Sequence, residues 1–221
     1  MKLFINALTK IILGFILISL LLFLPAGTFA YPGAWLFMGL LFVPMVIMGA
    51  VMLAKAPDLL KKRLNVKEKE STQKGVIAFS GLIFPVGFVV SALDYRFGWS
   101  DVPLWLTVIS AVLFLTGYAM YAEVMRENAY LSRTVEVQEG QRVISTGLYG
   151  LVRHPMYLAT ILMFVPLPIV LGSLWGLIPF GFYPILMVVR IINEEKVLTE
   201  GLSGYKEYKS KVRYRLIPFI W

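Results

Sequence analysis

The chain has 221 residues, of which 58% are hydrophobic and 15% charged, with a mean hydropathy of +0.76 and a formal net charge of +8. Soluble domains carry about 25% charged residues, and here the apolar residues come in long runs, which favours membrane spans over a soluble core. Because the chain contains no cysteine, structural disulfides, thiolate zinc sites and a cysteine nucleophile are excluded.

Six apolar segments follow one another along the chain, at about residues 4–24, 33–54, 76–92, 103–122, 157–171 and 174–192. The first, second, fourth and sixth are long enough to cross a bilayer as helices, at about 20 residues a span. The fifth is short and contains Pro166 and Pro168, with Gly172-Ser173 after it, which is typical of one arm of a tight helical hairpin. The sequence predicts an all-α membrane protein with five or six transmembrane helices and a C-terminal helical hairpin.

The first segment has a second interpretation. Lys2 and Lys10, the apolar run and the small residues around Thr28-Phe29-Ala30 also fit a secretory signal with a cleavage site. We expect an uncleaved first span, and the orientation of the remaining segments is the same in either case.

The basic residues fall on one side of a six-span arrangement, with Arg96 as the exception. By the positive-inside rule, both termini are predicted to be cytoplasmic in a multi-pass protein of the cell inner or plasma membrane. The net charge then attracts anionic lipid, and nucleic-acid binding is the weaker interpretation because the charge is spread over loops. The basic residues on this side are Lys2, Lys10, Lys55, Lys61, Lys62, Arg63, Lys67, Lys69, Lys74, Arg126, Arg133, Arg142, Arg153, Arg190, Lys196, Lys206, Lys209, Lys211, Arg213 and Arg215.

Nearly all candidate chemistry lies in the C-terminal half of what we expect to be a single membrane domain. Residues 1–122 are predicted to be a transmembrane scaffold without internal polar clusters, and residues 123–221 hold the polar motifs. Between the fourth and fifth segments, residues 134–138 alternate apolar and polar side chains and Glu139-Gly140 marks a turn. This pattern fits either a short extended hairpin or an ordinary loop.

The only histidine of the chain, His154, stands in Arg153-His154-Pro155-Met156-Tyr157 at the start of the fifth segment. Proline is favoured in the first turn of a helix, so we expect His154 at the cap. Further on, Arg190 and Glu194 are four residues apart and share a helix face. Taken singly, these are a structural histidine and a snorkelling arginine with its partner. In a tight hairpin they converge with Tyr157 at the lipid–water boundary, where ionisable groups indicate a functional site.

At these residues the chain resembles the isoprenylcysteine carboxyl methyltransferase and phospholipid methyltransferase superfamily of integral membrane enzymes. The resemblance is confined to the C-terminal half, and residues 1–122 match only in being transmembrane. The chain departs from the family pattern at Leu148, where the family has proline, and at Leu202-Ser203-Gly204, where it has Phe-Gly, which leaves the path of the tail open. The matching elements are Glu139-Gly140-Gln141 through Gly147-Leu148-Tyr149, Arg153 through Tyr157, Arg190-x-x-x-Glu194-Glu195, Tyr205-x-x-Tyr208 and Arg213-x-Arg215-Leu216-Ile217-Pro218.

The resemblance implies cytoplasmic segments that bind S-adenosylmethionine, no metal ion, and Arg190 and Glu194 as the catalytic residues, with Arg190 facing the acceptor. Glu194 can then meet the ammonium group of the donor, and Arg190 can hold a carboxylate acceptor by two hydrogen bonds. Thr134 is implied as a more distant cofactor contact. The implied cofactor-binding residues are Gln141, Arg142, Val143, Ile144, Tyr149, His154, Pro155, Met156, Tyr157 and Glu194.

The acceptor stays open at this point. A prenylated cysteine, an amine-headed phospholipid, a small thiol and another lipid are all consistent with the pattern, and the expected partners are the bilayer and a lipid or lipid-anchored acceptor, with no obligate protein partner. Two non-enzymatic classes of membrane protein are the remaining alternatives. A transporter or channel uses polar residues near the bilayer midplane, of which the first four segments offer few, and an assembly protein needs no convergent polar site.

Overall fold

A computed structural model describes residues 1–64, 71–132 and 134–221 of the chain. Lys67, Lys69 and Arg133, which belong to the basic set that predicts the orientation, lie outside these residues, as does the side chain of Lys74. Throughout the described part of the chain the regular secondary structure is helical and no strand is present, so the predicted fold class is confirmed.

Five helices are long and apolar enough to cross a membrane, which agrees with the predicted five or six spans. The long helices are α1 (Lys2–Ala26), α2 (Pro32–Lys55), α4 (Ser71–Phe97), α5 (Leu104–Glu127) and α9 (Tyr183–Gly201), the last continuing α8 (Leu177–Gly181). The shorter elements are α3 (Pro57–Leu64), a 3-10 turn η1 (Gly147–Gly150), α6 (Pro155–Phe164), α7 (Leu167–Val170) and α10 (Tyr205–Lys211).

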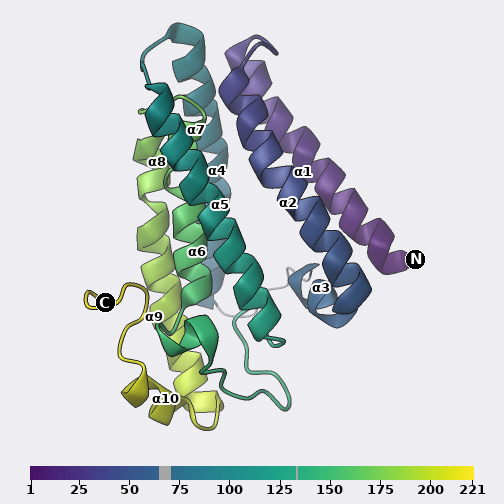
Figure 1. Ribbon diagram of the computed structural model, residues 1–221, viewed down its shortest axis with the longest axis vertical. Helices are drawn as coiled ribbons and strands as arrows, with labels where there is room; N and C mark the ends of the chain where they lie inside the picture. The colour runs from purple at the N-terminus through teal and green to yellow at the C-terminus, as the bar shows by residue number, and fades with distance from the viewer. Residues whose placement is uncertain (65–70, 133) are drawn as a thin grey trace.

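The predicted hairpin is formed by α6 and α7 going up and by α8 and α9 coming back (Figure 1). Pro155 occupies the first turn of α6 and His154 its cap position, as the sequence predicts. The helix ends at Phe164, just before Pro166, because a proline has no N–H to continue the hydrogen-bond ladder. The segment at 134–144 is a loop, with a turn at Glu139-Gly140 in which the Gln141 N–H donates to the Gln138 carbonyl at 3.1 Å.

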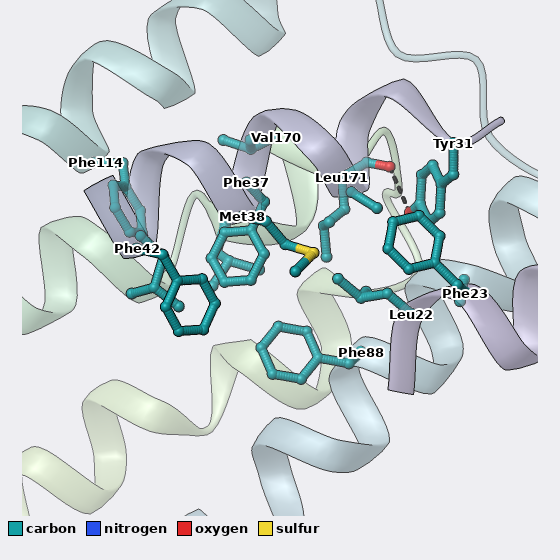
Figure 2. Packing of buried hydrophobic residues seen from close by; sticks show 14 of the residues in the cluster. Leu22, Phe23, Tyr31, Phe37, Met38, Phe42, Phe88, Phe114, Val170 and Leu171 are labelled. Carbon is teal, nitrogen blue, oxygen red and sulfur yellow. Dashed lines mark hydrogen bonds between the residues drawn. The ribbon is translucent and has the colours of Figure 1, made fainter. Parts of the chain in front are cut away.

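Helices α4, α5, α6 and α9 form one bundle, whereas α1 and α2 lean away from it toward the end where α3 lies (Figure 1). Helices α5 and α6 pack so closely at Gly117 that only glycine fits there. A Cβ on this residue would stand 2.6 Å from the Ala159 carbonyl oxygen. The apolar core joins α1 and α2 to the bundle near its other end (Figure 2). There Phe37 and Phe88 pack together, and the Tyr31 hydroxyl donates to the Leu171 carbonyl at 2.7 Å.

A buried polar cluster lies at that same end, which corrects the prediction of a scaffold without internal polar clusters. The Asp94 carboxylate near the end of α4 is fully buried. It accepts hydrogen bonds from the Ser100 N–H and hydroxyl, each at 2.7 Å, and from the Ser173 hydroxyl at 2.6 Å. Asp94 thereby ties the tip of the hairpin to the α4–α5 connection. This cluster could not be predicted from the sequence, because Ser173 is 79 residues away from Asp94 along the chain.

Candidate active site

A cavity lies at the end of the bundle opposite Asp94, between the 128–157 segment, α9 and α10. The space between these elements amounts to about 830 Å³, and it is open to solvent on one side. Its wall contains every residue that the sequence predicts to contact a cofactor, together with Arg190 and Thr134. These residues are Thr134, Gln141, Arg142, Val143, Ile144, Tyr149, His154, Pro155, Met156, Tyr157, Arg190 and Glu194.

The Tyr157 hydroxyl joins the two charged residues on α9. The Arg190 Nε donates to the hydroxyl at 2.9 Å, and the hydroxyl donates to Glu194 Oε2 at 2.5 Å. The Arg190 guanidinium also lies 5.8 Å from the centre of the Tyr157 ring. The sequence predicts that these three residues meet, and the hairpin brings them together because the start of α6 and the C-terminal part of α9 are neighbours.

His154 lies in the cavity wall but its side chain turns to a different carboxylate. His154 Nε2 is 3.3 Å from Glu195 Oε1, one residue beyond Glu194. Glu195 is buried and also accepts hydrogen bonds from Arg153 Nε at 2.6 Å and Arg215 Nε at 3.0 Å. Sequence reasoning missed Glu195 as the centre of this network, although Glu194-Glu195 is part of the motif.

The tail returns to the site through backbone hydrogen bonds. The N–H groups of Arg153 and His154 donate to the carbonyls of Tyr214 and Arg215, both at 2.9 Å. The turn into α10 depends on Gly204, whose φ of 81° lies in the left-handed region that favours glycine. The difference from the family pattern at Leu202-Ser203-Gly204 leaves the path of the tail open in the sequence. These hydrogen bonds define that path and place α10 against the cavity.

Tyr149 ties the loop before α6 to both sides of the cavity. Its hydroxyl accepts from Asn128 Nδ2 at 2.9 Å, and its carbonyl accepts from the Tyr208 hydroxyl at 2.7 Å. Burial raises the pKa of both the Tyr149 and the Tyr208 phenol above the ordinary value. Both side chains therefore stay neutral and keep these hydrogen bonds at physiological pH.

The 3-10 turn η1 is fixed by Glu127 at the end of α5. Gly147 begins this turn with a φ of +50°, and a Cβ there would stand 1.6 Å from Glu127 Oε1. Glu127 Oε2 accepts from the Leu148 N–H at 3.2 Å. Glycine is therefore required at position 147 both by the backbone conformation and by the neighbouring carboxylate.

Two residues of the N-terminal half also reach this end of the bundle, and no local pattern in the sequence indicates either of them. Gln73 on α4 is fully buried and donates through Nε2 to the Arg190 carbonyl at 3.3 Å. Arg63 on α3 donates to the Ser132 carbonyl at 3.0 Å and lies 3.9 Å from the Met156 sulfur. Ser132 and Met156 line the cavity, so both halves of the chain contribute to its support.

Parts of the chain are similar to known proteins. Residues 105–204 match the phospholipid methyltransferase family. Over 93 residues the chain is 28% identical to the Delta(14)-sterol reductase TM7SF2 of the mouse (Mus musculus), a match that takes in 40% of this chain and 22% of the reductase. The chain thus matches only about a fifth of the length of that relative.

The fold is similar to that of a eukaryotic intramembrane Ras methyltransferase, isoprenylcysteine carboxyl methyltransferase, with a TM-score of 0.55 and 19% sequence identity. The likeness covers 92% of this chain and 74% of the methyltransferase. The family match spans the cavity residues from Asn128 to Leu202, and the structural likeness extends the fold to the N-terminal helices. Residues 105–204 are thus similar to the phospholipid methyltransferase family, and the fold of the chain is similar to that of an integral membrane methyltransferase.

Proposed function

We propose that this protein moves a methyl group from S-adenosylmethionine to a lipophilic acceptor, which is a lipid or a lipid-anchored molecule. The observation that carries the proposal is the convergence of the motif residues on one cavity. Segments that are far apart in the sequence supply its wall, and Tyr157 links Arg190 to Glu194 there.

The chemistry of the cavity wall fits such a donor. Glu194 offers a carboxylate for an ammonium group, and Ser132 and Thr134 offer hydroxyls. Val143, Ile144, Leu198 and Leu202 offer apolar surface for an aromatic base. When bound, S-adenosylmethionine supplies a methyl group activated on a sulfonium, and the residues of the cavity bind it, orient it and exclude water.

Glu194 is the residue that we assign to the ammonium group, and Tyr157 holds its carboxylate in place by donating a hydrogen bond to it. A neutral hydrogen-bond donor can do this without neutralising the charge that attracts the ammonium group. His154 is held toward Glu195, so we assign it to shaping the cavity wall with Pro155 and Met156.

Arg190 is the residue that we assign to the acceptor. It lies one helical turn, about 5.4 Å, before Glu194 and so deeper along α9, where a lipid-borne group can arrive from the bilayer. Its permanent charge suits a carboxylate, which needs no base to react. An amine or a thiol acceptor would need a group that takes up its proton, and so the proposal favours a carboxylate acceptor, with a phospholipid amine or a thiol as the alternatives.

The direct test is methyl transfer with isotope-labelled S-adenosylmethionine. The purified protein in detergent is incubated with membrane lipid extracts and with a prenylated cysteine carrying a free carboxylate, and the label is followed into the organic phase by mass spectrometry. We expect wild-type protein to label a lipophilic product. Glu194→Gln should lower the rate at subsaturating donor by at least about tenfold, since a hydrogen bond to a charged group is removed.

The matched control is Glu200→Gln, because Glu200 is exposed on the same helix and outside the cavity. We expect this variant to keep the wild-type rate. No labelled lipophilic product from any of the acceptors, or equal loss in both variants, would count against the proposal.

A further inference from the structure

Helix α10 brings two tyrosines, Tyr205 and Tyr208, into the cavity wall. Both side chains are buried, and their ring centres are 5.8 Å apart. The Tyr208 hydroxyl is paired, because it donates to the Tyr149 carbonyl at 2.7 Å. The Tyr205 hydroxyl is buried as well, yet it has no hydrogen-bond partner among the residues that the structure describes.

A buried hydroxyl without a partner destabilises a folded protein, because it gives up its hydrogen bonds to water and forms none in their place. A phenylalanine at position 205 would keep the place of the ring in the apolar cluster around α10 without that cost. The described residues leave the Tyr205 hydroxyl unpaired, and the place of this side chain in the cavity wall makes a bound ligand a suitable partner for it.

The local geometry holds Tyr205 on the same side of the cavity as Glu194. Leu198 follows Glu194 by four residues on α9, so the two share one helix face, and Leu202 is the residue that caps the end of this helix. The Tyr205 N–H donates to the Leu202 carbonyl at 3.2 Å, and the left-handed backbone of Gly204 makes this turn possible. The backbone of Tyr205 is thus fixed beside the cavity, where its side chain is buried.

The protonation of Tyr205 defines what it can bind. Burial, and after it the carboxylates of Glu195 and Glu194, raise the pKa of this phenol well above its ordinary value. The side chain is therefore neutral at physiological pH and offers an O–H donor. A partner that presents a hydrogen-bond acceptor fits this O–H donor, and a carboxylate, a sugar hydroxyl and a ring nitrogen are examples.

We propose that the Tyr205 hydroxyl donates a hydrogen bond to the bound methyl donor and is a further binding residue of the cavity. This inference rests on the proposed function. It adds a contact from α10 to those from the 134–157 segment and α9, and it gives α10 a role in binding as well as in closing the cavity.

Calorimetric titration of the full-length protein with S-adenosylhomocysteine tests this, since that product binds without turnover. We expect Tyr205→Phe to bind about tenfold more weakly than wild type. The ligand-free variant should unfold at the wild-type temperature or above it, because no internal hydrogen bond is removed. Tyr208→Phe is the matched control and should unfold at a lower temperature, because the bond to Tyr149 is removed.

A second ligand, 5′-methylthioadenosine, lacks the amino-acid end and locates the contact. A loss of affinity for both ligands in Tyr205→Phe puts the contact at the adenosine end, and a loss for S-adenosylhomocysteine alone puts it at the amino-acid end; both support the inference. Wild-type affinity of Tyr205→Phe for S-adenosylhomocysteine overturns it. If wild-type protein itself binds neither ligand, the proposed function fails, and so the two failures are distinguishable.

Discussion

At the scale of single residues, Arg190 and Glu194 both hydrogen-bond to the Tyr157 hydroxyl, but we assign Arg190 to the methyl acceptor and Glu194 to the methyl donor. A change at Arg190 should therefore affect turnover more than donor affinity. Arg190→Lys keeps the charge but removes the planar fork and the Nε–H that donates to Tyr157. We expect turnover to fall by about tenfold or more, because a hydrogen bond between charged groups is worth about 1.5–3 kcal/mol and this one belongs to the acceptor. The affinity for S-adenosylmethionine should change by less than about threefold.

Binding calorimetry and labelled methyl transfer on the same preparations measure both quantities. Turnover at the wild-type rate would remove Arg190 from the acceptor site. A parallel fall in donor affinity would place it in the donor site instead.

Gly147 offers a residue-scale test of how the cavity loop is held. Gly147→Ala should destabilise the fold more than Gly140→Ala. Both glycines have positive φ, but a Cβ at position 140 meets nothing within 4 Å whereas one at position 147 meets Glu127. The left-handed conformation alone costs an alanine about 1–2 kcal/mol, which we expect for Gly140→Ala, and the clash adds to it at position 147.

Thermal unfolding in detergent ranks these two variants. Combining Gly147→Ala with Glu127→Ala should cost less than the sum of the single changes, because the carboxylate that causes the clash is gone. Equal unfolding temperatures for Gly140→Ala and Gly147→Ala would contradict the account of this turn.

At the scale of elements, the two ends of the hairpin differ in what they do. The Asp94 cluster fixes the tip of the hairpin near α7, and the cavity lies beside α10. Figure 1 shows α7 and α10 at opposite ends of the bundle. Asp94→Asn replaces a carboxylate that accepts three short hydrogen bonds by an amide with one acceptor oxygen. We expect it to lower stability by about 1.5–3 kcal/mol while S-adenosylmethionine affinity stays close to wild type.

Thermal unfolding and calorimetry measure the two effects, with the exposed Asp101→Asn as the control. A loss of donor affinity in Asp94→Asn without a loss of stability would contradict this prediction, because the hydrogen bonds of Asp94 do not reach the cavity.

The elements themselves were largely predictable from the sequence. Length and hydropathy indicated the long helices, and the prolines at 155 and 166 indicated where α6 begins and breaks. The ends of the helices were less predictable. Helix α4 runs over 71–97 rather than 76–92 and α5 to Glu127 rather than residue 122, because polar residues continue a helix beyond its apolar run when neighbouring helices pack against it. No pattern in 123–156 could show a loop rather than strands, since alternation over a few residues fits both.

At the scale of the whole molecule, the polar motif residues were predictable as a group, but their supports were not. Tyr157, Arg190 and Glu194 meet as the spacing and the hairpin predict. Gln73 contacts Arg190 across 117 residues of sequence, and such a contact leaves no local pattern. Glu195 and Tyr205 stand inside the motifs, but their roles depend on the path of the tail, which local residues do not define.

The placement of the basic residues predicts how the molecule sits in the membrane. Lys61 on α3 and Lys206 on α10 are exposed at the cavity end of the bundle, whereas Asp101 is exposed between α4 and α5 at the other end (Figure 1). We propose that the cavity end is cytoplasmic. Single cysteines at 61, 206 and 101, in a chain that has no other cysteine, should be labelled by a membrane-impermeant reagent from the cytoplasmic side at 61 and 206 and from the other side at 101. Labelling of 61 and 206 from opposite sides would contradict the arrangement.

The central claim is that the cavity at this end binds the methyl donor, and equilibrium binding of S-adenosylmethionine to the purified protein tests it most directly. We expect saturable binding at one site per chain, weakened by about ten- to a hundredfold in Glu194→Gln and unchanged in Glu200→Gln. A reduced nicotinamide, the usual hydride source of reductases, is the control ligand because of the similarity to a sterol reductase. Saturable binding of the nicotinamide without binding of S-adenosylmethionine, or unchanged donor affinity in Glu194→Gln, would contradict the account.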